Sequence, residues 1–123
     1  MKLTPEDAEF LTEPQIANIA SVLRDGSPHV VPVWIDTDGE ALLFNTFKGS
    51  VKHRNLERDP RVAISVVDKA DPYRKVLVRG SVEFVEEGAD AHLDKLAKKY
   101  LNQDTYPWRD PKQVRVIGRV VPK

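Results

Sequence analysis

Residues 45–61, NTFKGSVKHRNLERDPR, contain the side chains of this chain that are best suited to bind an anion. The segment carries Lys48, Lys52 and Arg54 before its first acidic residue, Glu57. The whole chain has 19 Lys+Arg and 19 Asp+Glu and therefore a formal net charge of zero. The positive charge here is thus local, which is typical of a site for phosphate or another small anion.

The same segment has the features of a helix N-terminus. Ser50 is a suitable N-cap, and residues 51–59 can form two helical turns before Pro60 ends them. The free N–H groups and partial positive charge at a helix start favour an anion. Gly49 lets the backbone approach a ligand closely, and Thr46 adds a hydroxyl. The candidate anion ligands are Thr46, Lys48, Ser50, Lys52, Arg54 and Asn55.

The charge pattern alone leaves three interpretations of this segment open. It is a solvated helical turn whose cations pair with Glu57 and Asp59, a phosphate site, or a patch that binds nucleic acid. The nucleic-acid interpretation is disfavoured, because Phe47 is the only aromatic residue of the segment and the chain is not basic overall. We therefore expect no nucleic-acid partner.

Other reactive motifs are absent from the sequence. There is no cysteine, which excludes disulfides, zinc thiolate sites and thiol nucleophiles. His29, His53 and His92 lack the spacing of metal ligands, so we expect no metal site. No serine has the context of a nucleophile elbow. If the protein is an enzyme, a bound cofactor is expected to carry the chemistry.

Length and composition predict an ordinary globular protein. The 123 residues fit one domain, residues 1–123, and 41% hydrophobic and 31% charged residues are usual values for this class. No apolar run approaches the roughly 20 residues of a membrane span. The N-terminus is too acidic and polar for a signal peptide, so a cytoplasmic location is expected.

The elements that must position the cationic segment are mostly strands. Turn signals and runs of β-branched and apolar residues predict strands at 16–23, 29–36, 40–46, 62–67, 75–86 and 113–121. The first three have short connections and are expected to form an antiparallel meander. Helices are predicted at 4–11 and 88–101, besides the short one after Ser50. Six strands with few short helices predict a mainly β protein, a small antiparallel barrel.

Two residues indicate where the strand backbone is unusual. Pro32 cannot donate a hydrogen bond to a neighbouring strand, so its strand lies at an edge or a bulge and has backbone groups free for another partner. Gly80 lies inside the long predicted strand at 75–86 and indicates a bulge, a bend or a close backbone approach.

Three of these stretches together resemble a known family. SPHVVPVWID, LLFNTFKGSVKHRNLERDPRVAISV and VLVRGSVEFV are similar to the pyridoxamine-5′-phosphate-oxidase-like superfamily of FMN-binding split β-barrels. Within it, the chain most resembles the flavin/deazaflavin oxidoreductases that use coenzyme F420. The resemblance covers roughly residues 4–121, and N-T-x-K-x-x-x-K-x-x-N-L-x-R-D-P-R is its most specific part.

The resemblance implies a six-stranded antiparallel split β-barrel and a homodimer with two cofactor sites at the interface. The expected cofactor is F420, with FMN as the alternative. Its phosphate would lie on the residue 46–55 segment and its ring along the 29–36 strand. The implied cofactor-binding residues, beyond the anion ligands named above, are Pro32, Val33, Trp34, Arg79, Gly80 and Trp108.

The resemblance also implies a reaction. Reduced F420 would transfer a hydride to an electrophilic C=C bond or a quinone-type organic substrate, without a covalent protein intermediate. A final proton would come from solvent or from Tyr106. The alternatives are an FMN-dependent oxidoreductase of the same fold and a non-catalytic protein that binds flavin, deazaflavin or haem.

Overall fold

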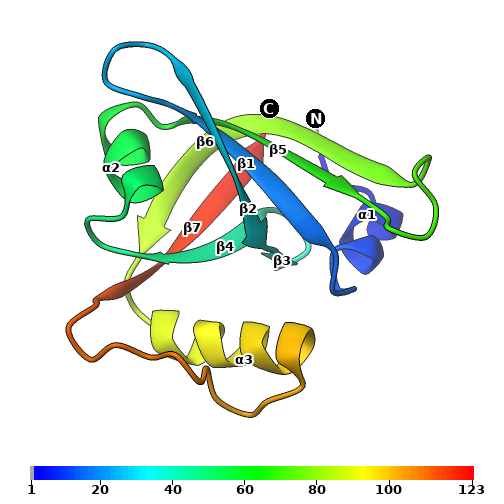
Figure 1. Cartoon of the computed structure of the whole chain (residues 1–123). Coiled ribbons are helices and arrows are strands. Elements are labelled where there is room, and N and C mark those ends of the chain that lie inside the picture. Colours follow the sequence, from blue (N-terminus) through cyan, green and yellow to red (C-terminus); the bar gives the residue numbers. More distant parts are fainter. Residues whose placement is uncertain (1) are drawn as a thin grey trace.

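The computed structural model describes residues 2–123, which contain seven strands and three helices (Figure 1). The strands are β1 (Ile16–Val22), β2 (Pro28–Trp34), β3 (Asp36–Thr37), β4 (Leu42–Phe47), β5 (Arg61–Val67), β6 (Lys75–Val85) and β7 (Arg115–Pro122). The helices are α1 (Pro5–Phe10), α2 (Val51–Arg58) and α3 (Ala89–Leu101). All strand pairs are antiparallel, which confirms a mainly β split barrel with few short helices.

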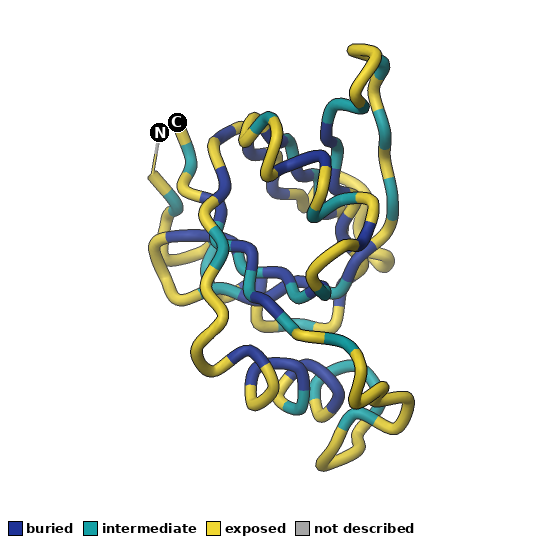
Figure 2. Tube along the Cα trace, turned by 90° about the vertical axis from the view of Figure 1, so that its left-hand side faces the viewer, coloured by how far each residue is buried: buried dark blue, intermediate teal, exposed yellow. Residues whose placement is uncertain are grey.

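The two edge strands of the sheet are neighbours along the chain, with one residue between them. Its strand order is β2-β1-β5-β6-β7-β4-β3, so β2 and β3 are the two edges. Only Ile35 separates them along the chain, and Ile35 is fully buried. The sheet must therefore curl until its two edges adjoin, and Figure 2 shows the resulting ring of strands.

Two details of the predicted strands are wrong. The strand predicted at 29–36 divides at Ile35 into β2 and β3, which gives seven strands instead of six. The predicted meander is wrong only in its second half: β1 pairs with β2 as expected, but β4 pairs with the two-residue β3 and with β7 and makes no ladder with β2. The edge position of β2 confirms the interpretation of Pro32, which faces Asn18 of β1.

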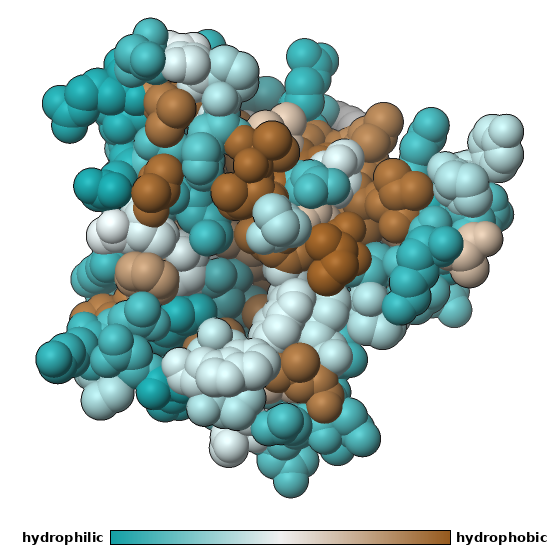
Figure 3. Space-filling model, in the orientation of Figure 1, coloured by the Kyte–Doolittle hydropathy of each residue, from teal (hydrophilic) through white to brown (hydrophobic). Residues whose placement is uncertain are grey.

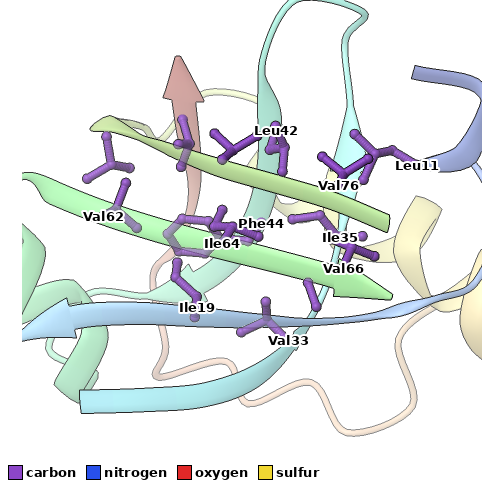
Figure 4. Close-up of a cluster of buried hydrophobic side chains, with 14 of the residues drawn as sticks. Leu11, Ile19, Val33, Ile35, Leu42, Phe44, Val62, Ile64, Val66 and Val76 are labelled. Atoms are coloured by element: carbon purple, nitrogen blue, oxygen red, sulfur yellow. The ribbon is translucent and has the colours of Figure 1, made fainter. Parts of the chain in front are cut away.

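The core fills the inside of this ring. Apolar residues from β1, β4 and β5, such as Ile19, Phe44 and Ile64, point into the space that the strands enclose (Figure 4). The Phe44 ring covers Gly118 of β7, where a Cβ atom would lie 2.2 Å from the ring. Gly80 confirms a close backbone approach, since a Cβ there would lie 2.1 Å from the carbonyl oxygen of Val121.

Helix α3 covers the outside of β4 and β7 rather than the core. It follows Gly88, which has a φ of 77°, and it buries one face that includes His92, Leu93 and Leu96. Figure 2 shows α3 outside the ring with its buried residues toward the sheet. Side chains on the outer face of β4 and β7, such as Asn45 and Arg115, therefore lie between the sheet and this helix.

Candidate functional site

A cavity of about 390 Å³ lies between β2, α2, α3 and β7. This volume is in the range of small-molecule sites. The residues that line it come from these elements, from β1 and β4, and from the segment after α3. They are Ile16, Pro32, Val33, Trp34, Asn45, Lys52, Leu93, Leu96, Tyr106, Trp108 and Arg115.

One wall of the cavity is aromatic. The Trp34 ring stacks on Tyr100, with ring centroids 5.1 Å apart and planes at 5°. Tyr106 meets Trp34 edge-on at 6.1 Å, and Trp108 meets Tyr106 edge-on at 5.7 Å. The Tyr100 hydroxyl accepts a hydrogen bond from the Ile35 N–H at 2.9 Å and so fixes the stack at the point where the sheet closes. Such a wall suits a planar, conjugated ligand.

The segment after α3 is tied to that helix by its charges. Arg109 donates to Asp90 at 2.7 Å and to Asp94 at 2.5 Å. The backbone N–H of Tyr106 donates to the Asp94 carboxylate at 2.9 Å. These contacts hold Tyr106 at the cavity, with the 65% exposed Trp108 beside it.

The other wall of the cavity is cationic and includes Lys52 and Arg115. Burial lowers the pKa of Lys52, and the neighbouring charge of Arg115 lowers it further. Burial also lowers the pKa of Arg115. Neither cation lies in ion-pair range of a carboxylate anywhere in residues 2–123. The attraction of an anion bound between them would offset both the desolvation cost of the two cations and their mutual repulsion.

The local structure of α2 places Lys52 at this wall. Ser50 caps the helix, because its Oγ accepts a hydrogen bond from the His53 N–H at 3.2 Å. The Thr46 and Ser50 hydroxyls are buried and lie 2.8 Å apart. The predicted N-cap is therefore confirmed, and it fixes Lys52 in the first turn of α2.

The structure brings together part of the predicted site. Pro32, Val33, Trp34, Lys52 and Trp108 line the cavity, and so does the candidate proton donor Tyr106. The solvated-turn interpretation does not describe Lys52, because Asp59 pairs with Arg61 at 2.7 Å and Glu57 lies 3.2 Å from His53.

The remaining predicted ligands lie outside the cavity lining. Lys48 pairs with Glu86 at 2.7 Å, while Arg54 and Arg79 are exposed. Asn55 is buried and donates to the Ser21 hydroxyl at 3.2 Å. Gly80 packs against the β7 backbone, and Thr46 and Ser50 bond to each other. A role for these seven residues in ligand binding stays a prediction.

Sequence reasoning missed Asn45 and Arg115. Both lie on the outer face of their strands, where β4 and β7 pair. The Arg115 guanidinium lies 5.7 Å from the centroids of both the Phe47 and the Tyr106 rings. An arginine that alternates with Val114 and Val116 was the available signal, but it is also typical of a solvated strand face.

Two further absences concern metals and membranes. The described residues 2–123 hold no group of three or more His, Asp or Glu side chains arranged to bind a metal ion. No helix in the same range combines the length and the apolar character needed to cross a membrane.

The chain is similar to a known protein family and to several solved structures. The family model for pyridoxamine 5′-phosphate oxidase matches residues 3–121. The solved structure of an F420 reductase is 37% identical to the chain, with a TM-score of 0.82, and the match covers 98% of this chain and 96% of that one. A comparison with curated proteins found no match.

Two more distant structures share the fold. A conserved hypothetical protein from Mycobacterium tuberculosis is 29% identical with a TM-score of 0.75, over 98% of this chain and 81% of that one. An FAD-binding protein from Mesorhizobium loti is 20% identical with a TM-score of 0.64, over 100% and 92% of the two chains. The latter likeness shows the fold alone.

Proposed function

The chain belongs to the pyridoxamine 5′-phosphate oxidase family of split β-barrels, and from this premise we propose that it is an F420-dependent oxidoreductase. The observation that supports a flavin-type ligand is the pairing of an aromatic wall with two desolvated cations in one cavity. Trp34 and Tyr106 offer faces and edges to a planar ring, while Lys52 and Arg115 offer charge to an acidic group.

The choice of F420 over FMN rests on the relative. At 37% identity over nearly the full length of both chains, the F420 reductase is similar enough to suggest a shared cofactor. Both cofactors combine a tricyclic ring with a phosphate, so the cavity walls suit either. FMN is therefore the alternative that the binding experiment must separate.

The proposed chemistry is reduction of an organic substrate. When bound, reduced F420 would supply a hydride to an electrophilic C=C bond or a quinone-type acceptor. The chain's own contribution is to hold the ring against Pro32 and Trp34 and to exclude water with the segment that carries Tyr106. Tyr106 is the proposed proton donor, because its side chain lines the same cavity.

Lys52→Ala should weaken F420 binding by about 1–3 kcal/mol, the usual loss for a charge-assisted hydrogen bond. Lys48→Ala tests the other lysine predicted to bind the phosphate, but Lys48 is half exposed and already paired with Glu86. We expect it to change the affinity less than about threefold. Fluorescence titration of purified protein with F420 and, separately, with FMN measures both effects.

Other outcomes of this titration, and of a separate turnover assay with reduced F420, would contradict different parts of the proposal. Tighter binding of FMN than of F420 would identify FMN as the cofactor, without changing the proposed site. Equal losses of F420 affinity in Lys48→Ala and Lys52→Ala would indicate that the anion binds closer to Lys48, near the start of the residue 45–61 segment. If reduced F420 binds but is not oxidised by added quinones or enones, the protein is a carrier rather than a reductase.

We also propose that the protein is a homodimer, which rests on an exposed apolar sheet face. The register aligns Val30, Ala20 and Ala63 in one row across β2, β1 and β5, which ends at the exposed Arg79 of β6, and Leu77 lies in the next row on β6. Val30 is 64% exposed and Leu77 is 56% exposed. Figure 3 shows apolar residues gathered on this side of the molecule. Pro32 belongs to the same face and lines the cavity, so a partner there would border the site.

The double variant Val30→Lys/Leu77→Lys should raise the dimer dissociation constant at least about 100-fold, because two-fold symmetry buries each unpaired charge twice. Sedimentation equilibrium measures this constant. Val114→Lys, at a 45% exposed position outside these four strands, is the control and should leave it unchanged. A monomeric parent protein would exclude the proposed interface outright.

A further inference from the structure

Arg115 is one end of a chain of polar side chains that runs beneath α3. Its Nε donates to Oδ1 of Asn45 at 2.9 Å. Nδ2 of Asn45 donates to the Ala89 carbonyl at 2.9 Å and lies 3.2 Å from Nδ1 of His92. Nε2 of His92 lies 3.3 Å from Oδ2 of Asp36, within ion-pair range but without the geometry of a hydrogen bond, and both of these side chains are buried.

The hydrogen bonds of Arg115 and Asn45 determine the orientation of the Asn45 amide and the position of the proton on His92. A guanidinium only donates, so the Asn45 side chain must turn its oxygen toward Arg115. Its amide nitrogen then faces Ala89 and His92, and Nδ1 of His92 must accept. The His92 proton is thereby assigned to Nε2, on the side of the Asp36 carboxylate. The orientation of the Asn45 amide is thus also set by Ala89 and His92, which do not line the cavity.

The Arg115 guanidinium, held by Asn45, still has N–H donors without a partner. Nε is bonded to Asn45, and Nη1 donates to Gln113 Oε1 at 3.1 Å. Nη2 makes no hydrogen bond within the described part of the chain, residues 2–123, and the same is true of Nζ of Lys52. Both residues line the cavity. Two cations therefore face one space with N–H groups free for a ligand.

We infer that Arg115 is a specificity-determining residue of this cavity, which selects ligands with an oxyanion. Together with Lys52 it binds a phosphate or carboxylate group of the ligand, and Asn45 is the positioning residue that aims its guanidinium. The inference rests on the proposed function only in taking that ligand to be a flavin-type cofactor. A planar guanidinium held at Nε presents its remaining N–H groups in a fixed geometry, which a lysine at this position would not reproduce.

The test compares ligands with and without the oxyanion. Dissociation constants are measured by fluorescence for F420 and its chromophore lacking the phosphate and tail, and for FMN and riboflavin. Arg115→Met should weaken binding of the phosphorylated member of the better-binding pair by about 10- to 100-fold and of its neutral counterpart by less than about threefold. Arg24→Met, at an exposed turn, is the charge-matched control and should change neither constant.

Two more variants separate positioning from folding. Asn45→Asp places a carboxylate against Arg115 and should cause the same selective loss, although it keeps the shape of the side chain. Arg115→Lys keeps the charge and should recover part of the affinity for the phosphorylated ligand. An equal loss for charged and neutral ligands would overturn the inference, and so would unchanged affinity in Arg115→Met.

An arm with inorganic phosphate separates this inference from the proposed function. If no flavin or deazaflavin binds the parent protein, the proposed function fails, but phosphate still probes the two cations. Phosphate should then raise the melting temperature of the parent protein more than sodium chloride of equal ionic strength does, and this excess should vanish in Arg115→Met. Equal stabilisation of both proteins would overturn the inference.

Discussion

Phe44→Ala should lower the free energy of unfolding by about 3–5 kcal/mol, the usual loss for a buried phenylalanine. The Phe44 side chain has no exposed surface, and its ring lies over Gly118 and meets Phe84 edge-on at 6.1 Å. Glycine at 118 is what admits the ring so close to the β7 backbone. Denaturation with urea, monitored by tryptophan fluorescence and circular dichroism, measures the loss.

A matched set of variants tests this explanation. Tyr73→Ala, at a position that is 89% exposed, should change the stability by less than about 0.5 kcal/mol. Gly118→Ala alone should destabilise the parent protein, because its Cβ would lie 2.2 Å from the ring. In the Phe44→Ala background the same methyl group should be tolerated or stabilising, since it enters the vacated space. Additive losses would show that Phe44 and Gly118 do not depend on each other.

This part of the core also bears on the site. Phe44 faces the inside of the ring, whereas its neighbour Asn45 faces α3 and the cavity. A shift of β4 caused by the loss of the ring would move Asn45, and with it Arg115. We therefore expect the stability of the core and the affinity for an anionic ligand to fall together in Phe44→Ala.

Local features of the site were predictable from the sequence because they depend on neighbouring residues. Ser50 caps α2 through a hydrogen bond that reaches only three residues along the chain. Pro32 identified an edge strand, because proline lacks the N–H that an interior strand needs. These two elements place Lys52 and Trp34 at the cavity, so the position of the site followed from short segments.

Long-range pairing was not predictable in the same way. The expected meander took neighbouring strands as partners, whereas β4 pairs with β7 from the far end of the chain. That pairing places Arg115 beside Asn45 and brings α3 over both. Likewise, the pairing of Lys48 with Glu86 depends on where β6 ends, which its own sequence does not reveal. The place of Arg115 at the site therefore depends on a strand pairing that its neighbouring residues alone do not specify.

Asp36 is the buried charge on which we expect acid stability to depend. Burial alone would raise the pKa of its carboxyl, but contacts with His92, the Thr37 N–H and Lys95 outweigh this and lower it to about 2. A carboxyl with a depressed pKa stabilises the fold above its ordinary value of 3.8, and this stabilisation is lost as the pH falls through about 2. The difference corresponds to about 2 kcal/mol at neutral pH.

Asp36→Asn should therefore cost about 2 kcal/mol of folding stability at pH 7 and only about 0.4 kcal/mol near pH 2, where the carboxyl of the folded parent protein is half protonated. Urea denaturation at intervals between pH 7 and pH 2 measures the gap between parent and variant. Asp59, whose pKa is also about 2 because of Arg61, titrates in both proteins and so cancels from that gap. Asp104→Asn is the control, since its side chain is 93% exposed and 3.7 Å from Lys98, and we expect no gap at any pH. A gap that stays constant down to pH 2 would instead assign the loss to packing around His92 and remove the charge of Asp36 from the stability of the fold.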